Sequence, residues 1–355
     1  MRRNTPPAAP IELKPLLELT GRVGADPLLT QASTGNSSIK LHDVLWIKAS
    51  GKWMADAGRE DILIPLGLAE VQRCVREDID PAERYGGASI ETAMHAVLPH
   101  RVVVHVHCVN TIAWAVRQDA PVQLKDRLCG LRWQWIPYVR SGMPLARDVE
   151  NALLEPAGTD VLVLGNHGLV VGGEDCGAVE NLLFEVRRRL AIPARTAHPA
   201  DYTALAEMTG GSGWDLPDDD AVHALGTDAN SREILARGLL YPCQAIFSSE
   251  RFAGGTSSSA SASAAEPFRA IPYSDFDGSW ERHYGGRRFL MIEGRGVILN
   301  PAMTQAERAM ISGLAQVVQR IRDTASLHYL TEADIAGISN SVAYRYRELA
   351  NAGKG

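Results

Sequence analysis

The chain has 355 residues, 45% of them hydrophobic, and a formal net charge of −6 at pH 7. That length predicts two domains, each large enough to bury a core of its own. The acidic balance argues against nucleic acid and anionic membranes as partners, because both require a basic surface. No stretch approaches the roughly 20 apolar residues of a membrane helix, so we expect no membrane span.

Residues 1–10 lack the apolar core of a signal peptide, and we expect them to form a disordered tip. The five cysteines show no CxxC spacing, which favours reduced thiols over a disulfide framework. Together these features predict a cytoplasmic protein.

In chain order, residues 11–200 alternate between strand and helix patterns, which predicts one α/β domain. Strand patterns lie at 37–41, 44–48, 61–65, 102–107, 134–136, 161–164 and 169–172. Helix patterns lie at 10–24, 67–77, 90–98, 111–118, 145–154 and 175–191.

A polar stretch follows, and residues 221–355 predict a smaller α+β domain. Residues 254–265 are rich in Gly, Ser and Ala and cannot bury much surface, so we expect a mobile loop there. This half carries no nucleotide-binding motif, and we expect it to shape the substrate pocket or an oligomer interface. Its expected elements are a strand at 244–247, a hairpin of 288–292 and 296–299, and helices at 305–322 and 332–350.

The strand pattern at 102–107 carries two histidines, His105 and His107. Residues i and i+2 of a strand point to the same face, so both imidazoles project from one rigid element. Neutral imidazole is a common ligand of zinc and other first-row divalent ions. The pair by itself fits a metal site about as well as it fits two hydrogen-bonded core histidines.

Two other segments can complete such a site. Glu91 begins the helix expected at 90–98, after the candidate N-cap Ser89, and His167 follows the strand at 161–164 in a Gly-Asn-His-Gly turn. Alone, Glu91 would be a first-turn carboxylate stabilised by the helix dipole, and His167 would be a turn residue. Together, three imidazoles and one carboxylate can hold a catalytic divalent ion with room for a substrate.

The order of these segments resembles the class II aldolase/adducin superfamily over roughly residues 20–195. The sequences of these segments are most similar to those of a longer branch of the superfamily with an extra C-terminal domain. The aldolase module of that branch is like that of the rhamnulose-phosphate aldolase/dehydrogenase proteins. The resemblance implies an α/β/α sandwich around a mostly antiparallel sheet, with the catalytic domain over 11–200. The matching stretches are STGNSSIK at 33–40, KASGKWMADA at 48–57, SIETAMH at 89–95, HVH at 105–107 and NHGLVV at 166–171.

By this resemblance, His105, His107, His167 and Glu91 are metal ligands, and Glu91 also serves as the catalytic base. The expected metal is Zn²⁺, with Mn²⁺, Co²⁺ or Fe²⁺ as alternatives. Adducin-type relatives have lost this set and serve as interaction proteins, whereas all four positions are intact here. The related ribulose-phosphate 4-epimerases carry Asp at the position of Glu91, which favours carbon–carbon bond chemistry for this chain.

The resemblance also implies a phosphate site. Small residues with free backbone N–H groups suit an anion, although without the resemblance these segments would be ordinary turns. The family's Ser-Ser before the glutamate is Ser89-Ile90 here, so a substrate carboxylate is the alternative to a phosphate. The candidate anion-binding residues are Gly35, Asn36, Lys48, Ser50, Gly51 and Ser89.

The acid that protonates the leaving oxygen has a weaker signal. The aldolases use a Tyr about one helix after the HxH strand, and this chain has Asp126 in that region. Asp126 is therefore the candidate catalytic acid, and an exposed helix charge is the alternative interpretation.

We expect a metal-dependent aldolase, a lyase of carbohydrate metabolism. It would cleave or form a carbon–carbon bond of a small hydroxylated keto compound, most naturally a sugar phosphate, through a metal-stabilised enediolate. Decarboxylation, 4-epimerisation and dehydration use the same intermediate and are alternatives, as is a non-catalytic adducin-like assembly module. The resemblance implies a homo-oligomer, favouring a tetramer, although the C-terminal half could cover the surface that shorter relatives use for association.

Overall fold

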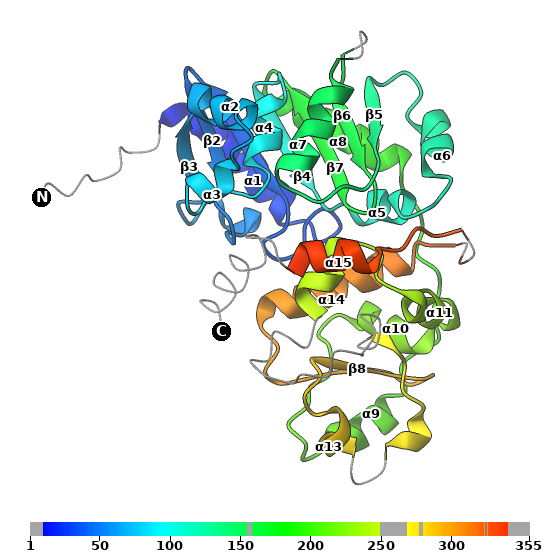
Figure 1. Ribbon diagram of the computed structural model, residues 1–355. Helices are drawn as coiled ribbons and strands as arrows, with labels where there is room; N and C mark the ends of the chain where they lie inside the picture. The colour runs from blue at the N-terminus through cyan, green and yellow to red at the C-terminus, as the bar shows by residue number, and fades with distance from the viewer. Residues whose placement is uncertain are drawn as a thin grey trace, which may run out of the picture.

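The computed structural model describes residues 10–154, 158–248, 268–276, 280–322, 324 and 326–339. A sheet domain holds the N-terminal half, and a second, mainly helical part lies against one end of it (Figure 1). The expected tip at 1–9, the expected loop at 254–265 and the end of the expected helix at 340–350 lie outside the described residues.

The sheet domain is built on seven strands in the order β3-β2-β1-β4-β7-β6-β5. Every neighbouring pair is antiparallel except β5 and β6, which are parallel. This confirms the predicted α/β fold with a mostly antiparallel central sheet. The strands are β1 (Asn36–Leu41), β2 (Val44–Lys48), β3 (Leu63–Gly67), β4 (Val102–Val106), β5 (Trp133–Ile136), β6 (Val161–Leu164) and β7 (Gly168–Gly173).

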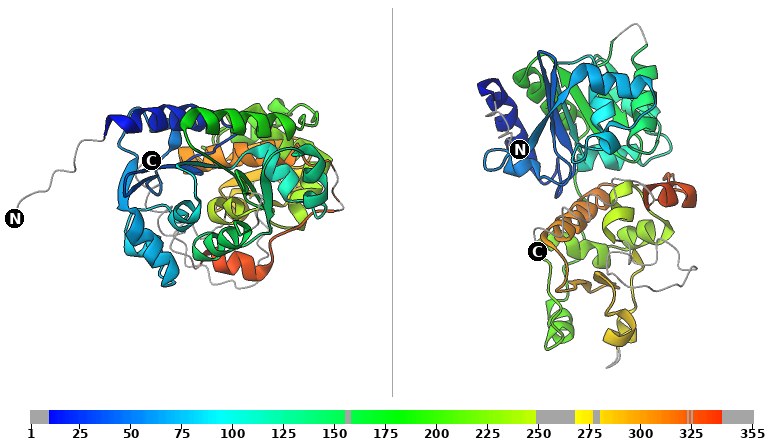
Figure 2. Two further views of the ribbon diagram at one scale, coloured as in Figure 1. Left: turned by 90° about the horizontal axis from the view of Figure 1, so that it is seen from above. Right: turned by 60° about the vertical axis from the view of Figure 1, so that its left-hand side comes forward.

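Helices cover both faces of the sheet, which gives the three-layer arrangement in Figure 2. One apolar cluster joins the sheet to α1, α6 and α8, while two others join the opposite face to α2, α4 and α7. Along the chain, the short helix α3 comes between α2 and α4, and α5 comes between α4 and α6. The bounds are α1 (Lys14–Gly24), α2 (Leu68–Arg76), α3 (Pro81–Arg84), α4 (Thr92–Val97), α5 (Val109–Ala115), α6 (Ala120–Arg127), α7 (Met143–Ala152) and α8 (Cys176–Arg189).

The alternation of side chains along strand β4 shows which face of the sheet carries His105. Val104 and Val106 pack in the cluster with α1 and α8, whereas Val103 packs in the cluster with α4 and α7. Because side chains alternate along a strand, His105 points to the same side as Val103. This side carries α4, at whose start Glu91 lies.

The C-terminal part contains a two-stranded hairpin surrounded by helices. Helix α14 begins with a capping box, in which Thr304 and Glu307 satisfy each other's backbone N–H groups.

The predicted division of the chain at 200 and 221 stays a prediction. Helix α9, which lies between these two points in the chain, packs against β9. The elements are α9 (Tyr202–Thr209), α10 (Ala224–Thr227), α11 (Ala229–Arg237), α12 (Pro242–Ser248), α13 (Trp280–Tyr284), β8 (Phe289–Ile292), β9 (Gly296–Leu299), α14 (Gln305–Val318) and α15 (Glu332–Ser339).

The strand expected at 244–247 is wrong, because these residues belong to helix α12. A short apolar run fits a buried strand and a buried helix equally well by periodicity. Pro242 opens the segment, and proline is well suited to the first turn of a helix, where its missing N–H has no partner to lose. Helix α12 then packs against α14 and α15, so tertiary contacts bury its apolar side chains.

The two parts share one continuous apolar cluster. Val109, Ile112 and Val116, from α5 and its end, pack with residues of α14 and α12 in the C-terminal part. Figure 1 shows α14 and α15 lying along this boundary. Among the described residues, no helix is long and apolar enough to cross a membrane.

Candidate metal centre

The three predicted histidine ligands meet at one end of the sheet. His105 lies in β4, His107 lies directly after it, and His167 lies in the turn between β6 and β7. The register pairs Val106 of β4 with Leu169 of β7, so this turn stands beside the end of β4. The ring centroids are 4.9–5.0 Å apart, and all three side chains are buried.

The turn before β7 is shaped by backbone conformations that few residues adopt. Asn166 has a φ of +50°, a left-handed conformation that Asn tolerates better than most residues. Gly168 must be glycine, because an added Cβ would lie 2.5 Å from the carbonyl oxygen of Val106 and 3.3 Å from the ring of His105. This close approach places His167 next to the other two rings.

The hydrogen bonds of His105 and His107 turn one nitrogen of each ring toward the centre. Nδ1 of His105 lies 3.1 Å from the carbonyl oxygen of Leu169. A carbonyl only accepts, so Nδ1 carries a proton, and Nε2 is the nitrogen that faces the centre and that a metal ion would take. That Nε2 lies 3.1 Å from Nε2 of His107, whose Nδ1 faces Sγ of Cys243 at 3.3 Å.

Glu91, at the N-cap of α4, places its carboxylate among these rings. Its Oε1 lies 3.2 Å from Nε2 of His167, and its Oε2 lies 3.4 Å from Nε2 of His105. Burial by itself raises the pKa of Glu91, but the facing His105 and His167 outweigh burial and hold the pKa well below its usual range. The carboxylate is therefore ionised in the folded protein.

A chain of hydrogen bonds holds this carboxylate from behind. Asn36 donates to Oε2 of Glu91 at 2.7 Å, and its amide oxygen accepts from Nε2 of His95. Since Nε2 of His95 carries the proton, the hydroxyl of Ser38 donates to its Nδ1 at 2.7 Å. Burial lowers the pKa of His95 to about 3, so this ring stays neutral.

Sequence reasoning missed three of these supporting residues, His95, Ser38 and Ser141. The hydroxyl of Ser141, in the loop after β5, donates to Oε1 of Glu91 at 3.3 Å. His95 had a signal that could have found it, because it lies four residues after Glu91 and such residues share a helix face. No local pattern points to Ser141.

Two of the candidate anion-binding residues, Asn36 and Ser89, contact Glu91. The amide of Asn36 is 3.1 Å from the hydroxyl of Ser89, and the N–H of Ser50 donates to the carbonyl of Gly87 at 2.9 Å. The Nζ of Lys48 is buried and donates to the carbonyls of Ser33, Ala49 and Lys52. The structure thus brings three loops together, and the anion-binding roles of Gly35, Asn36, Lys48, Ser50, Gly51 and Ser89 stay predictions.

Asp126 is not brought to this centre. It is exposed on α6, and no hydrogen bond or ion pair among the described residues joins it to the histidines or to Glu91. Its role as the catalytic acid stays a prediction that needs a second chain to bring it near the site.

The three imidazoles fit a divalent ion. Their ligand atoms all lie within 4.8 Å of one another, so small side-chain movements bring them to the roughly 2.1 Å typical of zinc–nitrogen bonds. Three neutral imidazoles with a carboxylate suit zinc and other first-row ions. A hydrogen-bonded Nδ1 on a ligating histidine is a usual feature of such sites.

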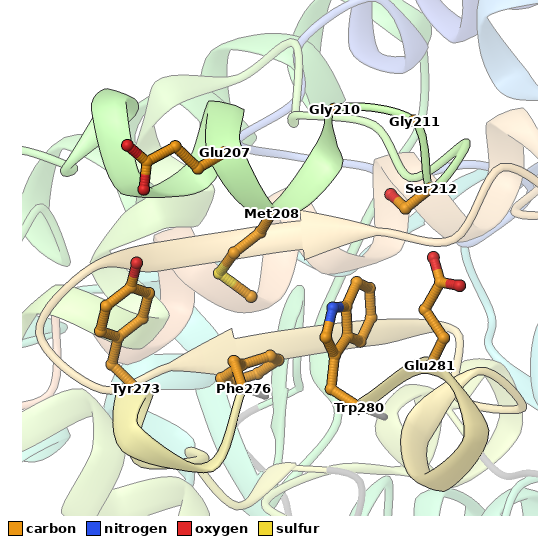
Figure 3. Close-up of a pocket in the computed structure, with 9 residues that line it drawn as sticks. All are labelled: Glu207, Met208, Gly210, Gly211, Ser212, Tyr273, Phe276, Trp280 and Glu281. Atoms are coloured by element: carbon orange, nitrogen blue, oxygen red, sulfur yellow. The ribbon is translucent and has the colours of Figure 1, made fainter. Parts of the chain in front are cut away.

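A separate cavity of about 440 Å³ lies in the C-terminal part (Figure 3). Glycines and aromatic rings form much of its wall, and Figure 3 shows Met208 and Trp280 pointing into the same space. Its lining includes none of the metal-site or anion-site candidates, so it is distinct from the histidine centre. Its side chains include Glu207, Met208, Ser212, Tyr273, Phe276 and Trp280.

Comparison with known proteins gives a family match over the part of the chain that carries the three histidines. The sequence profile of the Class II Aldolase and Adducin N-terminal domain matches residues 17–192. The chain is 26% identical over 187 residues to the uncharacterized oxidoreductase YuxG of Bacillus subtilis (strain 168), which covers 46% of this chain and 27% of that protein. The chain therefore spans about a quarter of the length of that curated relative.

Two solved structures are similar to about half of this chain. The N-terminal class II aldolase domain of a conserved protein from Thermoplasma acidophilum is 21% identical with a TM-score of 0.45, and the match covers 54% of this chain and 97% of that one. The L-fuculose-1-phosphate aldolase from Thermus thermophilus is 20% identical with a TM-score of 0.36, and the match covers 50% of this chain and 92% of that one.

Proposed function

The chain belongs, through residues 17–192, to the class II aldolase and adducin family, and on this premise we propose that it is a metal-dependent aldolase. It is a lyase that breaks or forms a carbon–carbon bond of a small hydroxylated keto compound, and we propose a sugar phosphate as the substrate. One observation carries the proposal: the ionised carboxylate of Glu91 lies within 3.4 Å of two of the three clustered imidazoles.

His105, His107 and His167 would hold the ion, and we propose Zn²⁺, with Mn²⁺, Co²⁺ or Fe²⁺ as alternatives. A bound divalent ion supplies Lewis-acid polarisation of the substrate carbonyl. The buried setting of the three rings excludes bulk water, which strengthens every electrostatic interaction there.

Glu91 is the proposed base. Its low pKa keeps it ionised, and its oxygens can take a proton from the carbon next to the substrate carbonyl and return it. Asn36 and Ser141 each donate to a different oxygen of Glu91, at 2.7 and 3.3 Å. These two bonds fix the carboxylate in the orientation that proton transfer requires.

We propose that the loops of Asn36, Ser50 and Ser89 bind the anionic end of the substrate. Backbone N–H groups and hydroxyls in tight loops form good anion sites. The contacts of Asn36 and Ser89 with each other and with Glu91 support this role, because an anion held there would place its attached carbon chain beside the base.

The proton donor has two candidates. Asp126, exposed on α6, would have to come from a second chain. Tyr138 lies two residues after β5. Its backbone nitrogen would be only 2.8 Å from a Cβ added at Gly165, which is two residues before His167. Its hydroxyl is buried with no hydrogen-bond partner among the described residues. Burial raises its pKa, so it retains the proton that a donor needs.

We further propose a cytoplasmic homo-oligomer, with a tetramer favoured. The five cysteines form no disulfide, which suits a reducing compartment. The exposed position of Asp126 supports assembly, because a neighbouring chain could then use it.

Carbon–carbon bond formation tests the proposed function directly. Protein loaded with Zn²⁺, Mn²⁺, Co²⁺ or Fe²⁺ would be incubated with dihydroxyacetone phosphate and small hydroxyaldehydes, and the products followed by NMR. We expect a new carbon–carbon bond with at least one metal and none with Glu91→Gln. Only decarboxylated, epimerised or dehydrated products would move the assignment to those reactions. A protein that binds no divalent ion would instead be an assembly module.

A further inference from the structure

The turn that carries His167 is hydrogen-bonded to two distant segments of the C-terminal part. The side-chain amide of Asn166 donates one hydrogen to the carbonyl of Leu240 at 2.8 Å and the other to the carbonyl of His328 at 2.7 Å. Asn166 is buried, so both bonds are shielded from competing water. Both donor hydrogens of the amide are therefore used by residues outside the sheet domain.

These two segments also hold each other and the sheet domain. The N–H of Leu330 donates to the carbonyl of Leu239 at 2.8 Å, and the N–H of His328 donates to the carbonyl of Val116 at 2.7 Å. The backbone N–H of Asn166 donates to the carbonyl of Ala115, at the end of α5, at 3.2 Å. Asn166 therefore lies where α5 and both C-terminal segments meet.

A second contact reaches the metal centre from the same side. Cys243, near the start of α12, is buried and its Sγ lies 3.3 Å from Nδ1 of His107. With Nε2 of His107 facing the centre as a metal ligand would, Nδ1 would carry the ring proton and donate it to sulfur, a weak acceptor. The C-terminal part thus contacts His107 directly and reaches His167 through its neighbour Asn166.

We propose that Asn166 and Cys243 are positioning residues through which the C-terminal part orients two ligands of the metal centre. Asn166 holds the left-handed turn that presents His167, and Cys243 fixes the ring plane of His107. Groups that orient metal ligands typically change metal affinity by about 10- to 100-fold when they are removed. This inference rests on the metal site of the proposed function, but not on which reaction the protein catalyses.

Two variants remove the contacts with little other change. Asn166→Gly deletes both amide bonds while the backbone keeps its φ of +50°, which glycine adopts readily. Cys243→Ala deletes the sulfur contact, whereas Cys243→Ser retains an atom that can accept from Nδ1 of His107 and should rescue the site. Asn300→Ala is the matched control, because Asn300 also donates its amide to two carbonyls, those of Gly285 and Arg287, away from the metal centre.

Zinc affinity, measured by competition with a chromogenic chelator, tests the inference in the full-length protein. We expect about 10- to 100-fold weaker binding for Asn166→Gly and Cys243→Ala, and wild-type affinity for Asn300→Ala and Cys243→Ser. The visible absorption of Co²⁺-substituted protein should shift in the two weakened variants, because it reports ligand geometry. Circular dichroism would establish that each variant is folded.

Three results would overturn the inference, and they differ from one another. If the wild-type protein binds Zn²⁺ and the two variants bind it equally well with unchanged Co²⁺ spectra, the C-terminal part does not position the ligands, and the proposed aldolase function stands. If Asn300→Ala weakens zinc binding as much as Asn166→Gly, the effect is general destabilisation. If the wild-type protein binds no divalent ion, both the inference and the proposed function fail.

Discussion

The amide of Asn36 donates a hydrogen bond of 2.7 Å to Oε2 of Glu91. Asn36 is the first residue of β1, and it pairs in register with His105 of β4. The strand pairing that builds the sheet therefore also fixes the carboxylate beside the histidines. The same amide nitrogen also lies 3.1 Å from the hydroxyl of Ser89, so Asn36 links the base to the candidate anion site.

Removing one imidazole should remove the metal. We expect His107→Ala to weaken zinc binding by more than about 100-fold, beyond the loss typical of groups that only orient ligands, and to abolish turnover. Circular dichroism would check that the variant is folded, because His107 is buried. Metal analysis of the dialysed protein checks this, with His198→Ala as a control at an exposed histidine. Full metal content in the His107→Ala variant would show that His107 is not a metal ligand.

Glu91→Gln separates proton transfer from metal binding. The amide has nearly the same shape but cannot take a proton, so we expect the variant to keep much of its zinc and to lose exchange of carbon-bound hydrogen with solvent. The measurement is deuterium incorporation into dihydroxyacetone phosphate, followed by NMR in heavy water. Exchange at the wild-type rate would move the role of base to another residue, with Asp126 examined first.

The C-terminal part should lose stability in acid through His223. Burial lowers the pKa of His223, although Asp219 and Asp220 favour its charged form. The N–H of Val297 donates to Nδ1 at 3.1 Å, so the ring accepts there and must stay neutral. The unfolded chain takes up the proton near pH 6.5 and the folded chain only at lower pH. The stabilisation is therefore present above about pH 6.5 and falls below it by up to about 1.4 kcal/mol per pH unit.

Urea unfolding of metal-free protein at pH 7.5 and 5.5 measures this loss. His223→Asn retains an acceptor for the N–H of Val297 and carries no titrating group, so its unfolding free energy should change less between the two pH values. Comparing the two proteins cancels the titration of the metal-site histidines, which both contain. An identical change in both proteins would show that His223 does not contribute.

Light scattering at micromolar concentration tests assembly. We expect a homo-oligomer, with a tetramer favoured, because Asp126 is exposed on α6 and reaches a metal centre only in a second chain. A 38.5 kDa species with full activity would contradict this. Tyr138, which belongs to the same chain as the histidines, would then be the remaining proton-donor candidate, and Tyr138→Phe should reduce turnover strongly.

The histidine cluster was predictable because its signals are local. The two-residue period of a strand puts His105 and His107 on one face, and a turn after a strand presents His167. Helix α12 was predicted wrongly as a strand, since the apolar run at 244–247 fits either element until its packing is known. The contacts of Asn166 and Cys243 were not predictable, because their partners lie 74, 162 and 136 residues away in the chain.

The hydrogen bond from Asn166 to His328 has a consequence for biosynthesis. The two residues are 162 positions apart, and ribosomes add about 5–20 residues per second, so His328 emerges about 10 to 30 s after the turn that carries His167. During that interval the nascent sheet domain presents its histidines without the segments that hold them. We therefore expect newly made chains to hold their metal firmly only once His328 has emerged, and products truncated before His328 to lose the metal to cellular chelators.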